Sequence, residues 1–138
     1  MATTKVTLAV LENAAVTTAK LASAAVTTAK LAGGTLGAIG FAATPLNAGT
    51  KSSGTYTPAE SSGNFQYAVN GGAHTLAPPT NNCTIVVQYT NNGSAGTITV
   101  SGFTLVDGDD ATTTDGDDFF YYITKLNGFS LLTVKALQ

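Results

Sequence analysis

The chain has 138 residues, the length of about one domain, and only 10% of them are charged, for a formal net charge of −2. It has no arginine and no lysine cluster, which argues against nucleic acid as a partner. A single cysteine excludes an intrachain disulfide. No apolar run is long enough for membrane insertion or a secretory signal, so we expect synthesis in the cytoplasm, where the chain stays unless it leaves with a larger particle.

Residues 1–33 carry a ten-residue unit written twice, AAVTTAKLAS and AAVTTAKLAG. The large apolar residues recur five positions apart, at Val16, Leu21, Val26 and Leu31. This spacing scatters them around a helix and places them on alternate faces of a strand. We therefore predict a stalk of short extended pieces, each followed by about one helical turn, whose apolar residues are buried by partner chains. A single Ala-rich helix is the alternative.

Residues 34–63 are rich in Gly, Pro, Ser and Thr, a composition typical of a connector. Leu36, Ile39, Phe41 and Leu46 recur too regularly for a free linker. We expect these four residues to pack while the glycines allow tight turns.

From residue 64 onward, short runs alternate between apolar and polar residues, which is typical of β-strands. In NFQYAV the alternation predicts that Phe65, Tyr67 and Val69 point inward and that Gln66 and Asn70 point outward. HTLAPP is expected to be a short strand that ends at its two prolines.

The next predicted strand, CTIVVQYT, places Ile85, Val87 and Tyr89 on one face, and the following Asn-Asn-Gly predicts a hairpin turn. GTITVSGFTLV changes phase at residues 101–102, which predicts a bulge or a sharp bend.

The last two predicted strands, DFFYYITKL and FSLLTVKAL, are joined by Asn127 and Gly128, a strong signal for a tight hairpin. Six short strands separated by turns predict a mainly β fold for residues 64–138. We expect an antiparallel β-sandwich of the jelly-roll-like type.

Aromatic residues follow one another without alternation at Phe119, Phe120, Tyr121 and Tyr122. One face of such a strand can fill a core, but the other needs a cover, because an exposed aromatic patch is an interface or an aggregation hazard. These residues therefore predict an interface between subunits. The alternative is a central strand buried on both faces within one chain.

All the aspartates lie in VDGDDATTTDGDD. Asp107, Asp109, Asp115 and Asp117 are candidate calcium ligands, since calcium prefers several carboxylate oxygens. The spacing does not match an EF-hand, and Asp-Gly pairs also form plain turns. A solvated loop is the favoured interpretation, with no cofactor.

Residues suited to catalysis are few. His74 and Cys83, each the single residue of its type, flank a Pro-Pro turn without a third group to orient them. A glycosidase needs two carboxylates across a sugar, whereas here Glu60 is the one carboxylate of the C-terminal part outside the aspartate loop. The sequence predicts a protein that is not an enzyme.

The units AAVTTAKLAS and AAVTTAKLAG resemble the AVTTAKIADG-type repeats of bacteriophage tail-fibre and related virion fibre proteins. The run from HTLAPPTNNCTIVVQYT to the C-terminal FSLLTVKAL is similar to the small β-knobs that end such fibres. The units here lack the usual Asp-Gly between copies, and two copies make a short stalk.

The resemblance implies a non-enzymatic homotrimer on the virion surface, made in the host cytoplasm. Three chains would wind together through Val16, Leu21, Val26 and Leu31 and carry three knobs. Capsid or tail proteins would be the other partners. The small size and the short shaft favour a head fibre or decoration protein on the capsid.

Loops at the end of the knob are the predicted outward contacts, through Asn91, Asn92, Asp109 and Asp110. The alternative function is a tail fibre or carbohydrate-binding adhesion module that contacts a glycan of the host surface. A hydrolase of surface polysaccharide is the third hypothesis.

Overall fold

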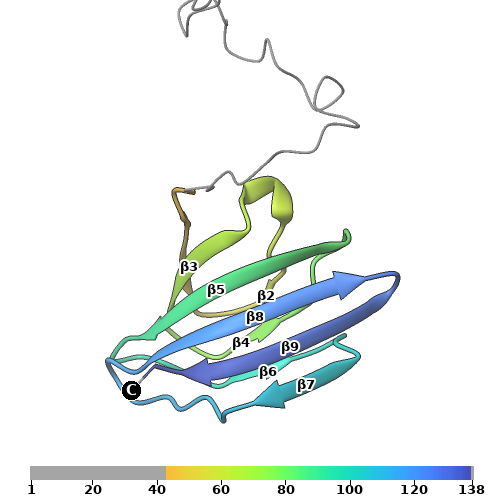
Figure 1. Ribbon diagram of the computed structural model, residues 1–138. Coiled ribbons are helices and arrows are strands. Elements are labelled where there is room, and N and C mark those ends of the chain that lie inside the picture. The colour runs from red at the N-terminus through yellow and green to blue at the C-terminus, as the bar shows by residue number, and fades with distance from the viewer. Residues whose placement is uncertain (1–42, 138) are drawn as a thin grey trace, which may run out of the picture. The chain divides into compact units, whose positions relative to one another are not determined.

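The computed structural model describes residues 43–137 (Figure 1), so the predicted stalk at residues 1–33 lies outside the described part. The elements are β1 (Leu46–Lys51), β2 (Thr55–Tyr56), the 3-10 turn η3 (Glu60–Ser62), β3 (Phe65–Asn70), β4 (His74–Leu76), β5 (Cys83–Asn91), β6 (Ile98–Val100), β7 (Leu105–Gly108), β8 (Asp118–Leu126) and β9 (Phe129–Ala136). The prediction of a mainly β fold is confirmed.

The strands form two sheets with the core between them. The larger sheet has six strands in the order β1-β3-β5-β8-β9-β7, and the smaller has three in the order β2-β4-β6. In Figure 1 the larger sheet faces the viewer and the smaller sheet lies behind it.

The chain alternates between the sheets from β1 to β6 and so winds in parallel coils. Consequently β1, β3 and β5 are parallel neighbours in the larger sheet, and β2, β4 and β6 are parallel neighbours in the smaller one. The pairs β5/β8 and β8/β9 are antiparallel, whereas β7 runs parallel to β9. The prediction of an antiparallel sandwich is therefore wrong. The larger sheet contains both parallel and antiparallel pairs, and the smaller sheet is parallel throughout.

The turn after β5 explains the error. Asn91, Asn92 and Gly93 do turn the chain, but the next strand, β6, belongs to the other sheet. The predicted hairpin is therefore absent at this turn. A turn signal in the sequence marks a change of direction without saying which strand becomes the neighbour.

The predicted connector contributes strands of its own. Residues 46–51 form β1, which pairs with β3, and residues 55–56 form β2, which pairs with β4. The strand-forming part of the chain thus begins before residue 64. The sequence of β1, LNAGTK, lacks apolar alternation, and so gave no signal of a strand.

Two turn predictions are confirmed by backbone geometry. Asn127 and Gly128 join β8 to β9 with φ values of 49° and 86°, the left-handed pair that a tight hairpin requires. Gly102 has a φ of 82° and lies between β6 and β7, where the chain passes from the smaller to the larger sheet.

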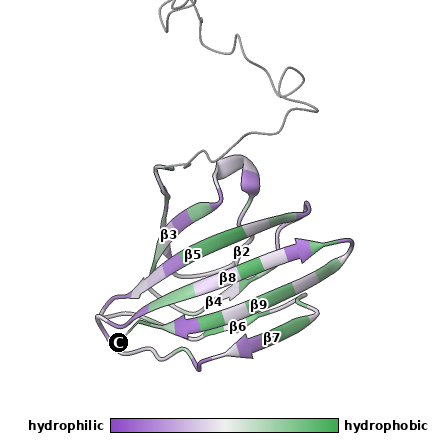
Figure 2. Ribbon diagram, in the orientation of Figure 1, coloured by the Kyte–Doolittle hydropathy of each residue, from purple (hydrophilic) through white to green (hydrophobic). Residues whose placement is uncertain are grey.

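The core contains the apolar residues of β5, β8 and β9 that face the smaller sheet, and Figure 2 shows hydrophobic segments on these strands. Ile85, Val87 and Tyr89 are buried as predicted. In β3 the prediction is inverted. Gln66 and Asn70 are buried, together with Ala68 between them.

Hydrogen bonds explain the inversion in β3. The side-chain amide of Gln66 donates to the carbonyls of Ala59 (3.0 Å) and Gly63 (2.8 Å), and its oxygen accepts from the Tyr56 hydroxyl. A buried polar group costs little when it is paired in this way. The aromatic residues of β3, Phe65 and Tyr67, consequently face outward.

Candidate interaction surface

The larger sheet turns an aromatic face away from the core. We call this the outer face and define it by the apolar residues Phe65, Tyr67, Val86, Phe120, Tyr122 and Leu131. The strand pairings align them in rows: Phe65 with Val86 and Tyr122, and Tyr67 with Gln88 and Phe120. Residues aligned across neighbouring strands share a face, so these side chains form one surface.

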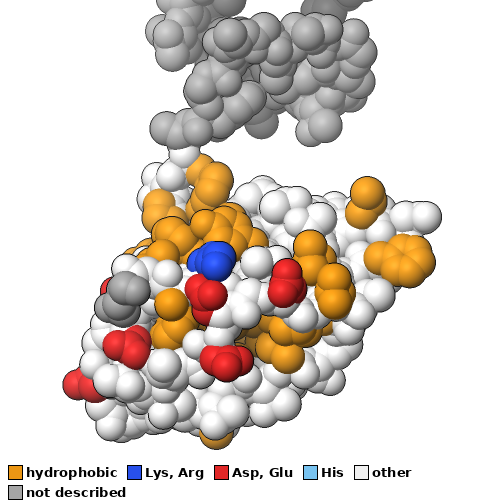
Figure 3. All heavy atoms as spheres, turned by 60° about the horizontal axis from the view of Figure 1, so that its bottom comes forward, with side chains coloured by type: hydrophobic (Ala, Val, Ile, Leu, Met, Phe, Trp, Pro, Cys, Tyr) orange, Lys and Arg blue, Asp and Glu red, His pale blue; other side chains and the backbone are white. Residues whose placement is uncertain are grey.

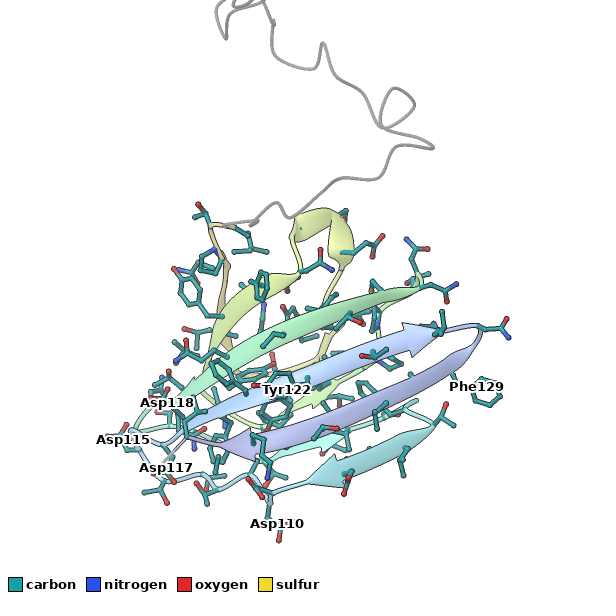
Figure 4. All side chains as sticks on the ribbon, viewed as in Figure 1. Asp110, Asp115, Asp117, Asp118, Tyr122 and Phe129 are labelled. Atoms are coloured by element: carbon teal, nitrogen blue, oxygen red, sulfur yellow. The ribbon has the colours of Figure 1, made fainter. Side chains whose placement is uncertain are left out.

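Several of these side chains are accessible. The exposed fractions are 50% for Phe65, 38% for Tyr67 and 41% for Tyr122. The rings of Phe120 and Tyr122 pack edge to face, with centroids 5.9 Å apart. Figure 4 places Tyr122 at the middle of the larger sheet. An aromatic patch of this kind on a small domain marks an interaction surface.

The outer face is hollowed near the start of the described chain. The hollow has a volume of about 420 Å³. Its walls combine aromatic rings with two glutamines and the residues that lead into β1: Ala43, Pro45, Phe65, Gln66, Tyr67, Val86, Gln88 and Phe120. The first described residues of the chain therefore lie beside the aromatic outer face.

A second apolar group lies at the end of the β8–β9 hairpin. Leu126 and Phe129 flank the turn and are 65% and 68% exposed. With Leu105 and Leu131 they line a hollow of about 450 Å³. Figure 4 shows Phe129 at this end and Asp115, Asp117 and Asp118 at the opposite end of the sheet. The domain therefore has one apolar and one acidic end.

In Figure 3 hydrophobic side chains form several groups on one face of the domain, with acidic side chains between them. Lys135, on the outward side of β9, pairs with Asp109 at 3.2 Å. Lys135 is also the register partner of Phe120, so the one ion pair of the described residues lies at the acidic margin of the outer face.

The structure divides the predicted aromatic interface into two pairs. Phe119 and Tyr121 are buried in the core, and Phe120 and Tyr122 lie on the outer face. Successive side chains of a strand point to opposite faces, so the four cannot share a surface. Phe65 and Tyr67 belong to that surface and were missed, because their alternation was interpreted in the wrong phase.

The predicted contact loops also differ from one another. Asn91 is buried and donates its amide to the Thr112 carbonyl at 3.0 Å, so it holds loops together. Asn92 accepts from the Ser94 amide at 2.9 Å in a partly exposed turn. Asp110 is exposed, whereas Asp109 is held by β9.

The aspartates are spread along their loop rather than gathered. Asp109 accepts from the Ala136 amide at 3.0 Å and from Lys135, and these hydrogen bonds lower the pKa of its carboxyl. Asp117 pairs with Thr112, Asp118 accepts from Thr90 and Gln88, and Asp107 is exposed. Within residues 43–137, no three side chains of His, Cys, Asp or Glu converge on a point where a metal could bind.

His74 lies in the core as part of a hydrogen-bonded cluster. Its Nδ1 lies 2.8 Å from the Gly72 carbonyl, and its Nε2 lies 3.2 Å from the Tyr89 hydroxyl. Because a carbonyl only accepts, Nδ1 donates to Gly72, and Nε2 forms the hydrogen bond with the Tyr89 hydroxyl. Both ring nitrogens of His74 are therefore occupied by hydrogen bonds within the domain.

The tyrosines around His74 stay neutral. Tyr89 packs edge to face on Tyr121 and Tyr56, with ring centroids 5.1 and 6.5 Å away. Burial raises the pKa of Tyr56 and of Tyr121 to about 12, and raises that of Tyr89 as well.

The Cys83 thiol has a raised pKa, whereas a nucleophilic cysteine has a lowered one. Its pKa is raised by partial burial and then by the nearby charge of Glu60, while Lys125 lowers it less. Reactive cysteines have a lowered pKa beside positive charge. Its Sγ donates to the Asn81 carbonyl at 3.4 Å, and its role in the structure is one of packing.

Comparison with protein-family models, curated proteins and solved structures found no match. Among the described residues, no helix has the length and hydrophobicity needed to cross a bilayer. The surface itself therefore carries the functional argument.

Proposed function

We propose that the protein is a non-enzymatic structural component of a bacteriophage virion. It is a short homotrimeric fibre or decoration protein whose N-terminal repeats attach to the particle, at the capsid, and whose β domain is exposed. The observation that carries this proposal is the accessible aromatic outer face, on a chain that also carries fibre-like repeats.

Two features of the chain favour an assembled state. The repeat residues Val16, Leu21, Val26 and Leu31 scatter around any single helix or strand, so burying them requires other chains. The described domain adds a second apolar surface that is half exposed in one copy. Both surfaces gain stability when copies associate, since apolar burial is the main driving force of association.

Sedimentation of the full-length chain tests the assembly. We expect a trimer, and we expect replacement of Val16, Leu21, Val26 and Leu31 by serine to weaken it. Replacement of Thr17 and Thr27 by serine is the matched control, because it alters the same units without removing the large apolar residues. A full-length chain that stays monomeric at all concentrations would contradict the proposal.

Attachment is tested on the particle that encodes the chain. Gold-labelled antibodies against the β domain should decorate the capsid in electron micrographs. Labelling of the tail would retain the virion role and replace the head fibre by a tail fibre. Particles that carry no label would contradict a virion role.

A second candidate function is binding of a host-surface glycan. The hollow of the outer face favours it, because Phe65, Tyr67 and Phe120 offer ring faces beside the amide of Gln88. Concave sites with aromatic walls and a few polar groups are typical of small-ligand binding. A glycan array without binders would contradict this function, and Phe120→Ala should abolish any binding found.

A further inference from the structure

The mixed larger sheet has an unusual accessible face. Its β1, β3 and β5 are parallel neighbours. All-parallel sheets are usually covered on both faces, and this sheet combines three parallel neighbours with the antiparallel pairs β5/β8 and β8/β9. In the described chain the inner face is covered by the smaller sheet, while Phe65 and Tyr122 on the other side remain about half exposed. Exposed aromatic side chains gathered on one face are typical of a surface that contacts a partner.

From this we infer that the outer face of the larger sheet is the contact between copies of the β domain, with Phe65, Tyr67, Val86, Phe120, Tyr122 and Leu131 packed against the same face of neighbouring copies. The inference rests on the proposed trimer and specifies which surface closes it.

The charges of the face favour an identical copy as the occupant. Across β3, β5 and β8 the row of Phe65, Val86 and Tyr122 and the row of Tyr67, Gln88 and Phe120 consist of uncharged side chains. The same rows carry charge only further along, at Asp107 in β7 and at Lys135 in β9. When identical surfaces meet around a symmetry axis, equivalent charges approach one another and repel. A face with an uncharged centre avoids this cost. Lys135, at the margin, is already paired with Asp109.

The size of the face suits such a contact. Six strands about 4.8 Å apart, of four to nine residues and about seven on average, at about 3.3 Å each, give a face of roughly 24 by 23 Å. This area, roughly 550 Å², is of the same order as the ~800 Å² that each partner buries in a standard stable interface.

The point of chain entry favours the same occupant. The 42 residues before Ala43 join the domain beside the hollow, since Ala43 and Pro45 line it together with Phe65 and Phe120. In the proposed trimer the repeats of three chains share one axis. A stalk shared by three chains would therefore connect to each domain at the region of its outer face.

A matched pair of variants tests the inference in the full-length chain. Thr124 and Thr99 are both exposed threonines in strands, Thr124 on the outer face of the larger sheet and Thr99 on the smaller sheet. Thr124→Lys places a charge two residues from Tyr122 on the same face, and Thr99→Lys places it on the opposite side of the domain. Neither variant removes an apolar side chain, so both should fold.

The measurements are the sedimentation mass and the rate at which hydroxyl radicals label Tyr122. In wild-type protein we expect a trimer with slow labelling of Tyr122. Thr124→Lys should reduce the mass or, where the repeats keep the chains together, raise the labelling rate several-fold. Thr99→Lys should change neither quantity.

The possible failures are distinguishable. A wild-type trimer in which Tyr122 is labelled equally fast in both variants overturns the inference and leaves the proposed trimer. A monomer with exposed Tyr122 overturns both. A monomer with protected Tyr122 overturns both and assigns the face to residues 1–42 of the same chain. Protection that appears only when host polysaccharide is added overturns the inference in favour of a glycan site.

Discussion

Asn70 donates its side-chain amide to the side-chain oxygen of Asn91 at 2.9 Å, although the two residues are 21 positions apart. They occupy the same register position at the ends of the parallel strands β3 and β5. The Asn70 amide also donates to the Gly96 carbonyl at 2.9 Å, and the Asn91 amide donates to the Thr112 carbonyl at 3.0 Å. This asparagine pair therefore joins two coils and two loops at one end of the domain.

Asn91→Ala should reduce the free energy of unfolding by about 1–3 kcal/mol, because it removes the acceptor of Asn70 and the donor to Thr112 inside the protein. Urea unfolding followed by circular dichroism measures the change. Asn92→Ala is the control, since its side chain bonds only within a partly exposed turn, and a smaller loss is expected. Equal losses would show that the buried asparagine pair contributes no more to the free energy of unfolding than the exposed turn does.

Gln66→Leu should destabilise the domain although it makes the core more apolar. The substitution leaves the Tyr56 hydroxyl and the Gly63 carbonyl without their partner and removes one of the two donors to the Ala59 carbonyl, which costs about 1–3 kcal/mol. Gln88→Leu, on the outward side of β5, is the matched control: it removes one hydrogen bond to Asp118, which keeps its bond from Thr90, so a smaller loss of stability is expected. Thermal unfolding compares the two. A more stable Gln66→Leu variant would contradict the argument.

Gly96→Ala should cost about 1–3 kcal/mol, as in an overpacked core. An added Cβ at Gly96 would lie 2.1 Å from the Ala73 nitrogen and 2.6 Å from the Gly72 carbonyl carbon, so the backbone would have to move. At Gly93, in the same turn, the nearest atom is 3.9 Å away. Gly93→Ala should therefore be close to neutral. Similar melting temperatures for the two variants would show that the loop adapts freely.

The buried tyrosines predict unfolding in alkali. The pKa of Tyr56 and that of Tyr121 are raised to about 12 in the folded state, against about 10 in an unfolded chain. The contribution of these two neutral hydroxyls to the free energy of unfolding is complete below pH ~10. It is lost as the pH rises through ~12, because the unfolded chain releases these protons more easily. Circular dichroism and tyrosinate absorbance should change together in this window.

Tyr121→Phe tests the origin of the alkaline transition. The variant lacks one hydroxyl that ionises more easily when unfolded, so its stability should fall less steeply between pH ~10 and ~12 than that of wild type. The comparison uses the slope of stability against pH, which is independent of a constant loss of packing. An unchanged slope would assign the transition to other groups.

Local signals in the sequence predicted the strands that pack one apolar face on the core. In β5 the apolar residues Ile85, Val87 and Tyr89 recur with period two, and only one face of the strand can hold them. The hairpin between β8 and β9 was equally predictable, because Asn127 and Gly128 tolerate the left-handed conformation that the turn needs. In both cases neighbouring residues carry the physical cause.

The aromatic face was predictable in part. The run from Phe119 to Tyr122 indicated that one side of β8 lies away from the core, and the pleat of the strand assigns Phe120 and Tyr122 to that side. In β3, polar and apolar residues also alternate, but the polar set is buried because η3 and β2 supply hydrogen-bond partners for Gln66. These partners, Tyr56, Ala59 and Gly63, lie 3 to 10 positions before Gln66, but the alternation within β3 does not indicate them.

The amino-acid sequence thus specified a chain of short strands, the inward residues of the central strands and the tight turn between the last two. The fold in space specified the parallel coils, the burial of Gln66 and Asn70, and the gathering of Phe65, Tyr67 and Tyr122 on one face. The reason is that alternation and turn residues act over a few positions. The partners of the parallel strands β1, β3 and β5, and the Asn91 oxygen that accepts from Asn70, come from segments about 20 residues away.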